Sequence, residues 1–189
     1  ITELKKEFLD LKNKKFYFSA GRLTYQKNFN FLIDSFINLK QENDEKIPLL
    51  IAGDGEEKIR LEKKVKAQKN NLVNLIGYKN NIYKFMKNSN AFILASNWED
   101  PGFVLIEAAF CRTFIISSNC KNGPLEFIAK DGGLLFENNN IEDFKDKIKK
   151  FINLSEDEKK KIKLEALKKS KNFTIFSHFT NLNKILNYS

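Results

Sequence analysis

Short apolar runs alternate with helical patterns along most of this chain, and that alternation limits its fold more than any other feature. The runs are three to five residues long, as buried strands are, and lie at 16–19, 48–52, 72–76, 91–95, 113–117 and 134–136. Their apolar residues are continuous, which predicts that both faces of each strand are covered. The sequence therefore predicts an α/β fold with a parallel sheet and helices on both of its faces.

The segments between these runs show helical spacing. The clearest one, at 29–37, places its apolar side chains on one buried helix face. Other helices are expected at 56–69, 81–87, 141–151 and 173–186, and a further one over 1–15. Asn140 is a candidate cap for the helix at 141–151, and Ser155 with Glu158 has the spacing of a capping box. Only helical patterns follow residue 136, which predicts a C-terminal helical tail.

Composition excludes several classes of protein. A length of 189 residues fits one domain, and 42% apolar content indicates a packed core rather than disorder. The net charge of +9 comes almost entirely from lysine, with three arginines among 33 basic residues. Because arginine is favoured for bidentate contacts with bases and phosphates, we expect a solvated lysine-rich surface and no nucleic acid partner. We expect a cytoplasmic protein, with weak peripheral attraction to the inner face of an anionic membrane as an open alternative.

Cysteine and histidine are too few and too scattered for a structural metal. Cys111 and Cys120 form no CxxC pair, which favours two reduced thiols in a cytosolic protein. The single histidine, His178, lies between phenylalanines in the tail and is more typical of a packed or surface side chain than of a catalyst. No Asp-x-Asp pair is present to hold a metal with a nucleotide diphosphate. We therefore expect neither a metal nor a cofactor.

Two carboxylates, Glu99 and Glu107, bracket a Pro101–Gly102 turn and an apolar segment that is expected to begin a helix. Glu99 follows the strand run at 91–95, and loops at the carboxyl ends of parallel strands form the ligand crevice of open α/β sheets. Glu107 is one or two turns into the helix, whose first N–H groups would point at the same crevice. Carboxylates accept from hydroxyls and free N–H groups bind phosphate oxygens, so the segment suits an anion that carries hydroxyls.

A glycine and two basic residues follow the first strand run. Gly21 allows a ligand close to the backbone, and Arg22 and Lys27 place two positive charges at the carboxyl end of that strand. This arrangement suits a diphosphate. The alternative interpretation is a tight turn with two solvated basic side chains.

Three further turns lie at expected strand ends, and each has a structural interpretation beside a functional one. Gly53–Asp54–Gly55 lacks the later glycine of a dinucleotide fingerprint, because Lys58 stands there, so it is more typical of a structural turn. Tyr78, after Gly77, is placed either against a nucleobase or over the edge of the core. The turn at 122–126 is either a ligand contact or a simple helix start.

Together these motifs resemble those of one family. The ordered set resembles the C-terminal, donor-binding domain of retaining glycosyltransferases of group 1, family 4 in the sequence classification. The residues that carry the resemblance are Gly21–Arg22, Lys27, Gly53–Asp54–Gly55, Gly77–Tyr78, Glu99 and Glu107. The resemblance implies the GT-B fold, in which two Rossmann-like domains face each other across a cleft. It implies a connecting helix or linker at 1–14, a nucleotide-sugar-binding Rossmann-like domain at 15–150, and C-terminal helices at 151–189 that pack back on the domain. The N-terminal, acceptor-binding domain would be absent from this chain.

The resemblance also implies a role for each matching residue. Arg22 and Lys27 would hold the donor diphosphate and stabilise charge on the leaving nucleotide, and Glu99 would contact the transferred sugar. These three are the implied catalytic residues. The implied substrate-binding residues are Gly21, Tyr78 near the base, the backbone N–H groups of Gly102, Phe103, Val104 and Leu105, and Glu107, which would accept from the ribose hydroxyls.

The activity implied by the resemblance is sugar transfer with retained configuration and without a metal. The donor would be a nucleotide-diphospho-sugar, with a UDP-sugar first, and the acceptor a glycan or lipid-linked molecule bound through the missing domain. The turn at 122–126 is similar to that of bacterial surface-polysaccharide transferases and points to polysaccharide or lipopolysaccharide biosynthesis. A GT-B-fold sugar-nucleotide epimerase and a non-catalytic α/β binding module are the alternatives. One departure is Arg112, which stands where the family usually has glycine at a helix end.

Overall fold

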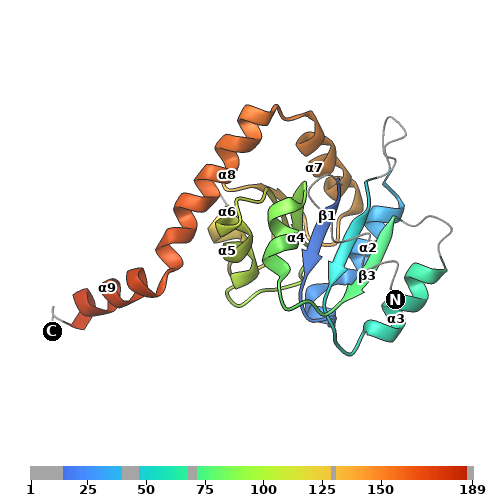
Figure 1. Cartoon of the computed structure of the whole chain (residues 1–189), viewed down its shortest axis with the longest axis horizontal. Coiled ribbons are helices and arrows are strands. Elements are labelled where there is room, and N and C mark those ends of the chain that lie inside the picture. The colour runs from blue at the N-terminus through green and yellow to red at the C-terminus, as the bar shows by residue number, and fades with distance from the viewer. Residues whose placement is uncertain (1–14, 40–46, 68–71, 129–130, 187–189) are drawn as a thin grey trace.

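The computed structural model describes residues 15–39, 47–67, 72–128 and 131–186. A six-stranded sheet lies at the centre of the domain (Figure 1), in the order β3-β2-β1-β4-β5-β6, and every neighbouring pair is parallel. The strands are β1 (Tyr17–Ala20), β2 (Leu49–Ala52), β3 (Val73–Gly77), β4 (Ala91–Leu94), β5 (Ile115–Ser118) and β6 (Leu134–Phe136). The predicted Rossmann-like α/β fold is therefore confirmed. The helix predicted over 1–15 lies, apart from its last residue, outside the described residues.

All six predicted strands are present, and their ends differ from the prediction by at most two residues. The largest difference is at β5, which begins at Ile115 rather than at Thr113. Thr113 donates its backbone N–H to the carbonyl of Ala108 (3.0 Å) and its hydroxyl to the carbonyl of Met86 (2.7 Å). Thr113 therefore belongs to the turn that closes the preceding helix, which an apolar pattern does not reveal.

Helices cover both faces of the sheet, as the continuous apolar strands predict. One face packs on α2 (Phe29–Ile37), α3 (Lys58–Lys66) and α7 (Ile141–Asn153). The other packs on α4 (Ile82–Asn88), α5 (Phe103–Phe110), α6 (Pro124–Ile128) and α8 (Glu156–Ser170). The consecutive residues Tyr17 and Phe18 point into opposite layers, and both are fully buried. With an apolar layer on each side, the sheet is a rigid base for the loops that leave its edge.

The predicted helix caps are confirmed. The Asn140 side chain accepts from the backbone N–H of Asp143 (3.0 Å), and Ser155 with Glu158 forms a complete capping box. Helix α2 has its predicted bounds. Helix α3 begins two residues later than predicted, and the N–H of Glu57, just before it, is bonded to the carbonyl of Leu23 (2.9 Å) in the loop after β1.

The two last helices differ in their packing. Helix α8 contacts α5 and α6, whereas α9 (Ile175–Leu186), which follows the short 3-10 turn η3 (Lys171–Phe173), extends away from the domain (Figure 1). Helix α9 buries no residue, and Phe176, Phe179 and Ile185 are 78%, 59% and 70% exposed. The packing of the C-terminal helices on the domain thus ends with η3, where Phe173 contacts Phe127. Nowhere in the described ranges does a helix have the length and apolar character needed to span a membrane.

Arg112 ends α5 in the left-handed conformation, at φ 56°. A side chain costs about 1 kcal/mol there relative to glycine. We therefore expect Arg112→Gly to raise the melting temperature by about 2–4 °C for a domain of this size, measured by circular dichroism. Arg60→Gly, an exposed arginine inside α3, is the opposite case and should lower it. A lower melting temperature in Arg112→Gly would contradict the presence of backbone strain at residue 112.

The order of the strands in the sheet reverses at β1: β2 and β3 are added on one side of it, and β4, β5 and β6 on the other. Strand β1 lies between β2 and β4; the helix that follows β1 packs on one face and the helix that follows β4 on the other. Such a switch point opens a crevice at the carboxyl ends of the two strands. The loop that leaves Ala20 carries Arg22 and Lys27 to this crevice, and the loop that leaves Leu94 carries Glu99 next to it.

Candidate functional site

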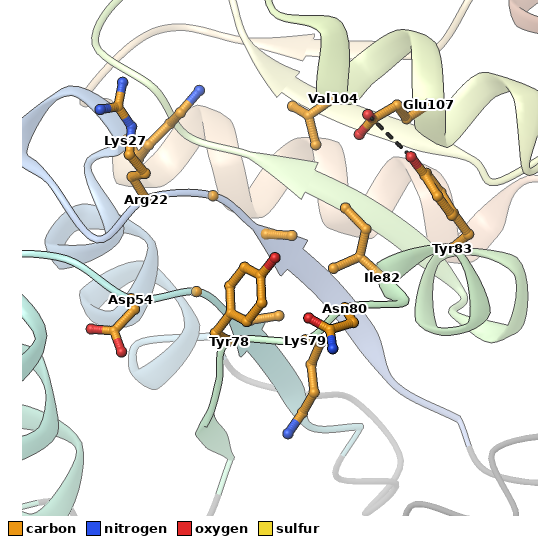
Figure 2. Close-up of a pocket in the computed structure, with 14 residues that line it drawn as sticks. Arg22, Lys27, Asp54, Tyr78, Lys79, Asn80, Ile82, Tyr83, Val104 and Glu107 are labelled. Carbon is orange, nitrogen blue, oxygen red and sulfur yellow. Dashed lines mark hydrogen bonds between the residues drawn. The ribbon is translucent and has the colours of Figure 1, made fainter.

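A cavity of about 400 Å³ opens beside the switch point, which is within the usual size of small-molecule sites. The loops after β1, β2 and β3 line it together with α4 and α5. Among the predicted site residues, the cavity is lined by Gly21, Arg22, Lys27, Tyr78, Val104 and Glu107. Figure 2 shows Arg22 and Lys27 on one side in this view and Glu107 on the other, with Tyr78 below and between them.

The remaining predicted residues lie next to the cavity without lining it. Glu99 is 2% exposed and Leu105 is 1% exposed, so both belong to the interior. The backbone N–H of Leu105, predicted as a donor to a ligand, instead donates to the carbonyl of Gly102 (3.0 Å) in the first turn of α5. Gly102 is the N-cap of α5 at φ 79°, and a Cβ on it would lie 3.3 Å from the Glu99 side chain. The side chain of Phe103 is 60% exposed. Of these residues, Glu99 and Gly102 lie behind the basic end of the cavity, since Glu99 pairs with Lys27 and Gly102 contacts Glu99.

Lys27 and Glu99 form a close ion pair at the basic end. The Lys27 Nζ lies 2.6 Å from Oε1 and 2.8 Å from Oε2 of Glu99, and the two side chains are only 15% and 3% exposed. A buried carboxylate needs such a partner, because removing it from water without one costs several kcal/mol. The ammonium group has one further donor for a ligand. Arg22 makes no ion pair with any described residue and is exposed, so its guanidinium remains available to an anion.

A chain of buried hydroxyls holds Glu99 from behind. The Ser96 hydroxyl donates to Glu99 Oε1 at 2.5 Å, and the Ser118 hydroxyl donates to the carbonyl of Ser96 at 2.7 Å. Both serines are fully buried. This network fixes the carboxylate in one orientation, with its charge balanced by Lys27.

Two glycines allow the loops of the site to approach one another. A Cβ on Gly53 would lie 2.0 Å from the carbonyl oxygen of Gly21, in the loop that carries Arg22. A Cβ on Gly123, at φ 103°, would lie 2.0 Å from the carbonyl oxygen of Pro101. The turn at 122–126 therefore supports the loop of Glu99 from outside. It does not line the cavity, which agrees with its structural interpretation.

Lys58 completes the turn after β2. Asp54 accepts from the backbone N–H of Gly55 (2.8 Å) and pairs with the Lys58 ammonium (2.8 Å). These bonds, the one with Lys58 first, lower the pKa of Asp54. The residue that breaks the dinucleotide fingerprint thus has a local structural role, while Gly53 and Asp54 reach the cavity.

Tyr83, at the carboxylate end of the cavity, is a polar residue that the sequence motifs did not indicate. Glu107 is half-buried on α5, and the Tyr83 hydroxyl of α4 lies 3.4 Å from its Oε1 (Figure 2), which is long for a hydrogen bond. Burial raises the pKa of Glu107, and the bond from Tyr83 opposes that rise. The negative charge of Glu107 in turn raises the pKa of Tyr83. Glu107 thus has an acceptor capacity that Tyr83 fills only weakly.

The cavity can therefore bind an elongated ligand with an anion at one end and hydroxyl donors at the other. Arg22 and Lys27 supply cationic donors, and Glu107 supplies a carboxylate acceptor. Within the part of the chain that the structure describes, no cluster of three or more His, Cys, Asp or Glu side chains is arranged to hold a metal ion.

Known proteins are similar to this chain in sequence and in fold. The sequence model of the family described as "Glycosyl transferases group 1" matches residues 1–171. An uncharacterised glycosyltransferase of Methanocaldococcus jannaschii is 38% identical over 133 residues, which are 68% of this chain and 32% of that protein. The N-acetylgalactosamine-N,N'-diacetylbacillosaminyl-diphospho-undecaprenol 4-alpha-N-acetylgalactosaminyltransferase of Campylobacter jejuni is 35% identical over 130 residues, 67% of this chain and 34% of that protein. This chain spans about a third of the length of these curated relatives.

A solved structure of a known protein is also similar to this chain in fold. A mutant of Staphylococcus aureus TarM, in complex with fondaparinux, alpha-GlcNAc-glycerol and UDP, superimposes with a TM-score of 0.78 at 25% identity. The match covers 92% of this chain and 35% of TarM.

Proposed function

Because this chain belongs to the group 1 glycosyltransferase family, we propose that it forms the half of a glycosyltransferase that binds the sugar donor. The donor is a nucleotide-diphospho-sugar, and the nucleotide is UDP. The observation that carries the proposal is the cavity with Arg22 and Lys27 at one end and Glu107 at the other. This pattern matches a diphosphate followed by a ribose with two free hydroxyls. The similarity to TarM, whose structure contains UDP, supports the choice of nucleotide.

Each end of the cavity has a defined task in this proposal. Arg22 and the remaining donor of Lys27 bind the diphosphate and stabilise the charge that develops on it as the sugar leaves. These cations do so without a metal ion. Glu107 accepts from the ribose hydroxyls, and Tyr78 lies against the base. The N–H groups at the start of α5 bind sugar hydroxyls and phosphate, and Glu99 lies beside the sugar and stabilises its oxocarbenium-like state.

The sugar is transferred to an acceptor that another domain holds. We propose transfer with retained configuration to a glycan or a lipid-linked acceptor in the assembly of a surface polysaccharide or lipopolysaccharide. The name of the Campylobacter relative, a transferase to a diphospho-undecaprenol acceptor, supports the acceptor class. The exposed apolar face of α9 is then free to contact the acceptor-binding half. A cytoplasmic position at the inner face of a membrane is consistent with the net charge of +9.

Calorimetric titration of this chain with UDP tests the proposal. We expect saturable binding of UDP, weaker binding of GDP, and a roughly 10- to 100-fold loss of affinity in Arg22→Ala and in Glu107→Ala, because each removes hydrogen bonds to a charged group. Arg60→Ala and Glu126→Ala, exposed residues of the same types outside the cavity, serve as matched controls. Equal affinities in all five proteins would reject the assignment of the cavity.

The raised pKa of Glu107 predicts a pH dependence of donor binding. Only the ionised carboxylate accepts from both ribose hydroxyls, so affinity falls as pH decreases through a pKa above the ordinary 4.5. We expect a loss of up to about tenfold, equivalent to about 1.4 kcal/mol, once Glu107 is protonated. UDP-glucose is the suitable probe, because it lacks the terminal phosphate of UDP that titrates near about pH 6. Glu107→Gln should bind weakly with a flat profile over the same range.

The same shift has a consequence for stability. A folded-state pKa above the unfolded value means that the folded protein holds the proton more tightly, so ionised Glu107 costs stability at neutral pH. Glu107→Gln should therefore melt at a slightly higher temperature than the wild type at pH 7. A lower melting temperature would show that the carboxylate has a stabilising partner.

A further inference from the structure

Two exposed aromatic rings lie in contact beside the basic end of the cavity. Tyr25 is 67% exposed and Trp98 is 45% exposed, and their ring centroids are 6.0 Å apart with the planes tilted by 53°. Neither residue lines the nucleotide cavity. We call this pair the aromatic platform. Tyrosine and tryptophan combine a large apolar ring with a polar atom and are enriched at binding interfaces.

Hydrogen bonds between two loops fix the platform. The backbone N–H of Asn97 donates to the carbonyl of Gln26 (2.8 Å), and the Asn97 side chain donates to the carbonyl of Tyr25 (2.9 Å). In return, the Gln26 side chain donates to the carbonyl of Trp98 (3.1 Å). The backbone that presents the two rings is therefore a paired and hydrogen-bonded segment.

The same two loops supply the ion pair of the donor site. Lys27 follows Tyr25 by two positions and Glu99 directly follows Trp98, so the loops place charges inward and rings outward. Further carboxamides adjoin the platform: the Asn139 amide donates to the Asn97 side chain (3.2 Å), and the Asn138 amide contacts the carbonyl of Asn97 (3.4 Å). Aromatic faces thus stand beside polar amides, next to the residues assigned to the transferred sugar.

We infer that the aromatic platform binds a sugar ring of the acceptor. A pyranose has one face of C–H groups that packs on an aromatic ring and an edge of hydroxyls that amides can bind. The inference rests on the proposed function, because an acceptor hydroxyl must reach the anomeric carbon of the donor sugar beside Glu99. Tyr25 and Trp98 stand on the same two loops as Lys27 and Glu99, so a ring held on them would lie next to the donor site. The donor half therefore contributes a subsite for the acceptor.

The single tryptophan of the chain makes the test direct, since all tryptophan emission comes from Trp98. The chain is saturated with UDP and titrated with N,N'-diacetylchitobiose or with lactose. We expect a saturable change in emission at millimolar concentrations of at least one disaccharide. Tyr25→Ala should weaken this binding at least fivefold. Phe176→Ala, which removes an exposed ring on α9, should leave it unchanged.

The outcomes separate the platform from the donor site. If UDP binds calorimetrically and neither disaccharide up to 100 mM changes the emission, the platform is not a sugar subsite. A blue shift with anionic phosphatidylglycerol vesicles and no response to sugars also overturns the inference, because the platform would then be a membrane contact. An emission response that depends on Tyr25, in a chain that binds no UDP, supports the platform and rejects the proposed donor instead.

Discussion

Lys27→Ala is expected to destabilise the domain by about 3 kcal/mol, because it leaves the buried carboxylate of Glu99 without its counter-charge. Urea unfolding followed by circular dichroism measures this effect as a lower midpoint. The matched control is Lys58→Ala, which breaks the pair with Asp54. Both of those side chains are largely exposed, at 39% and 55%, so the midpoint should remain close to that of the wild type.

A double substitution separates the structural role of Lys27 from its role toward a ligand. Lys27→Met with Glu99→Gln removes both charges and keeps similar side-chain volumes, so most of the lost stability should return. UDP affinity should stay at least tenfold below that of the wild type, because the diphosphate has lost one of its two cations. Wild-type affinity in the double variant would mean that Lys27 serves only to neutralise Glu99.

This ion pair also shows where inference from sequence ends. Lys27 and Glu99 were both predicted as site residues, each from its place after a strand, but as separate groups with separate ligands. They are 72 positions apart, and no local pattern specifies the pairing. It follows from β1 and β4 being neighbours in the sheet, which places the two loops side by side.

The fold itself was predictable because its signals are local. Continuous apolar runs identified all six strands, and the Asn140 and Ser155 caps have short-range patterns. The errors lie at strand ends, as at Thr113, where hydrogen bonds to a distant helix decide the boundary. Tyr83 was missed for a related reason. It lies in a predicted helix with no motif around it, and only the packing of α4 on α5 brings it to Glu107.

The glycines of the site were assigned to turns, and the structure gives two of them a more specific role. The sequence shows that Gly53 and Gly123 follow strands, which is typical of many turns. The need for glycine comes from backbone that approaches from another loop, the carbonyls of Gly21 and Pro101. The support of the Glu99 loop by the turn at 122–126 is therefore a tertiary property. Sequence reasoning could only leave it open between a structural and a ligand role.

Gly53→Ala should therefore distort the donor cavity. Its Cβ would lie 2.0 Å from the Gly21 carbonyl oxygen, so the loop that carries Arg22 has to move. Because the obstacle is backbone rather than a flexible side chain, we expect a loss of about 3 kcal/mol in stability. We expect UDP affinity to fall at least tenfold, since a 1 Å displacement of a charged donor is enough to lose its hydrogen bond.

Gly77→Ala is the control that separates this collision from simple loss of a glycine. A Cβ on Gly77 meets no atom within 4 Å, and its φ of 69° costs only about 1 kcal/mol. Thermal unfolding and UDP titration of the two variants should therefore differ, with the larger loss in both measurements at Gly53. If Gly53→Ala bound UDP as tightly as Gly77→Ala does, the position of the Arg22 loop would not control donor binding. The diphosphate would then have to be held mainly by Lys27 and the start of α5.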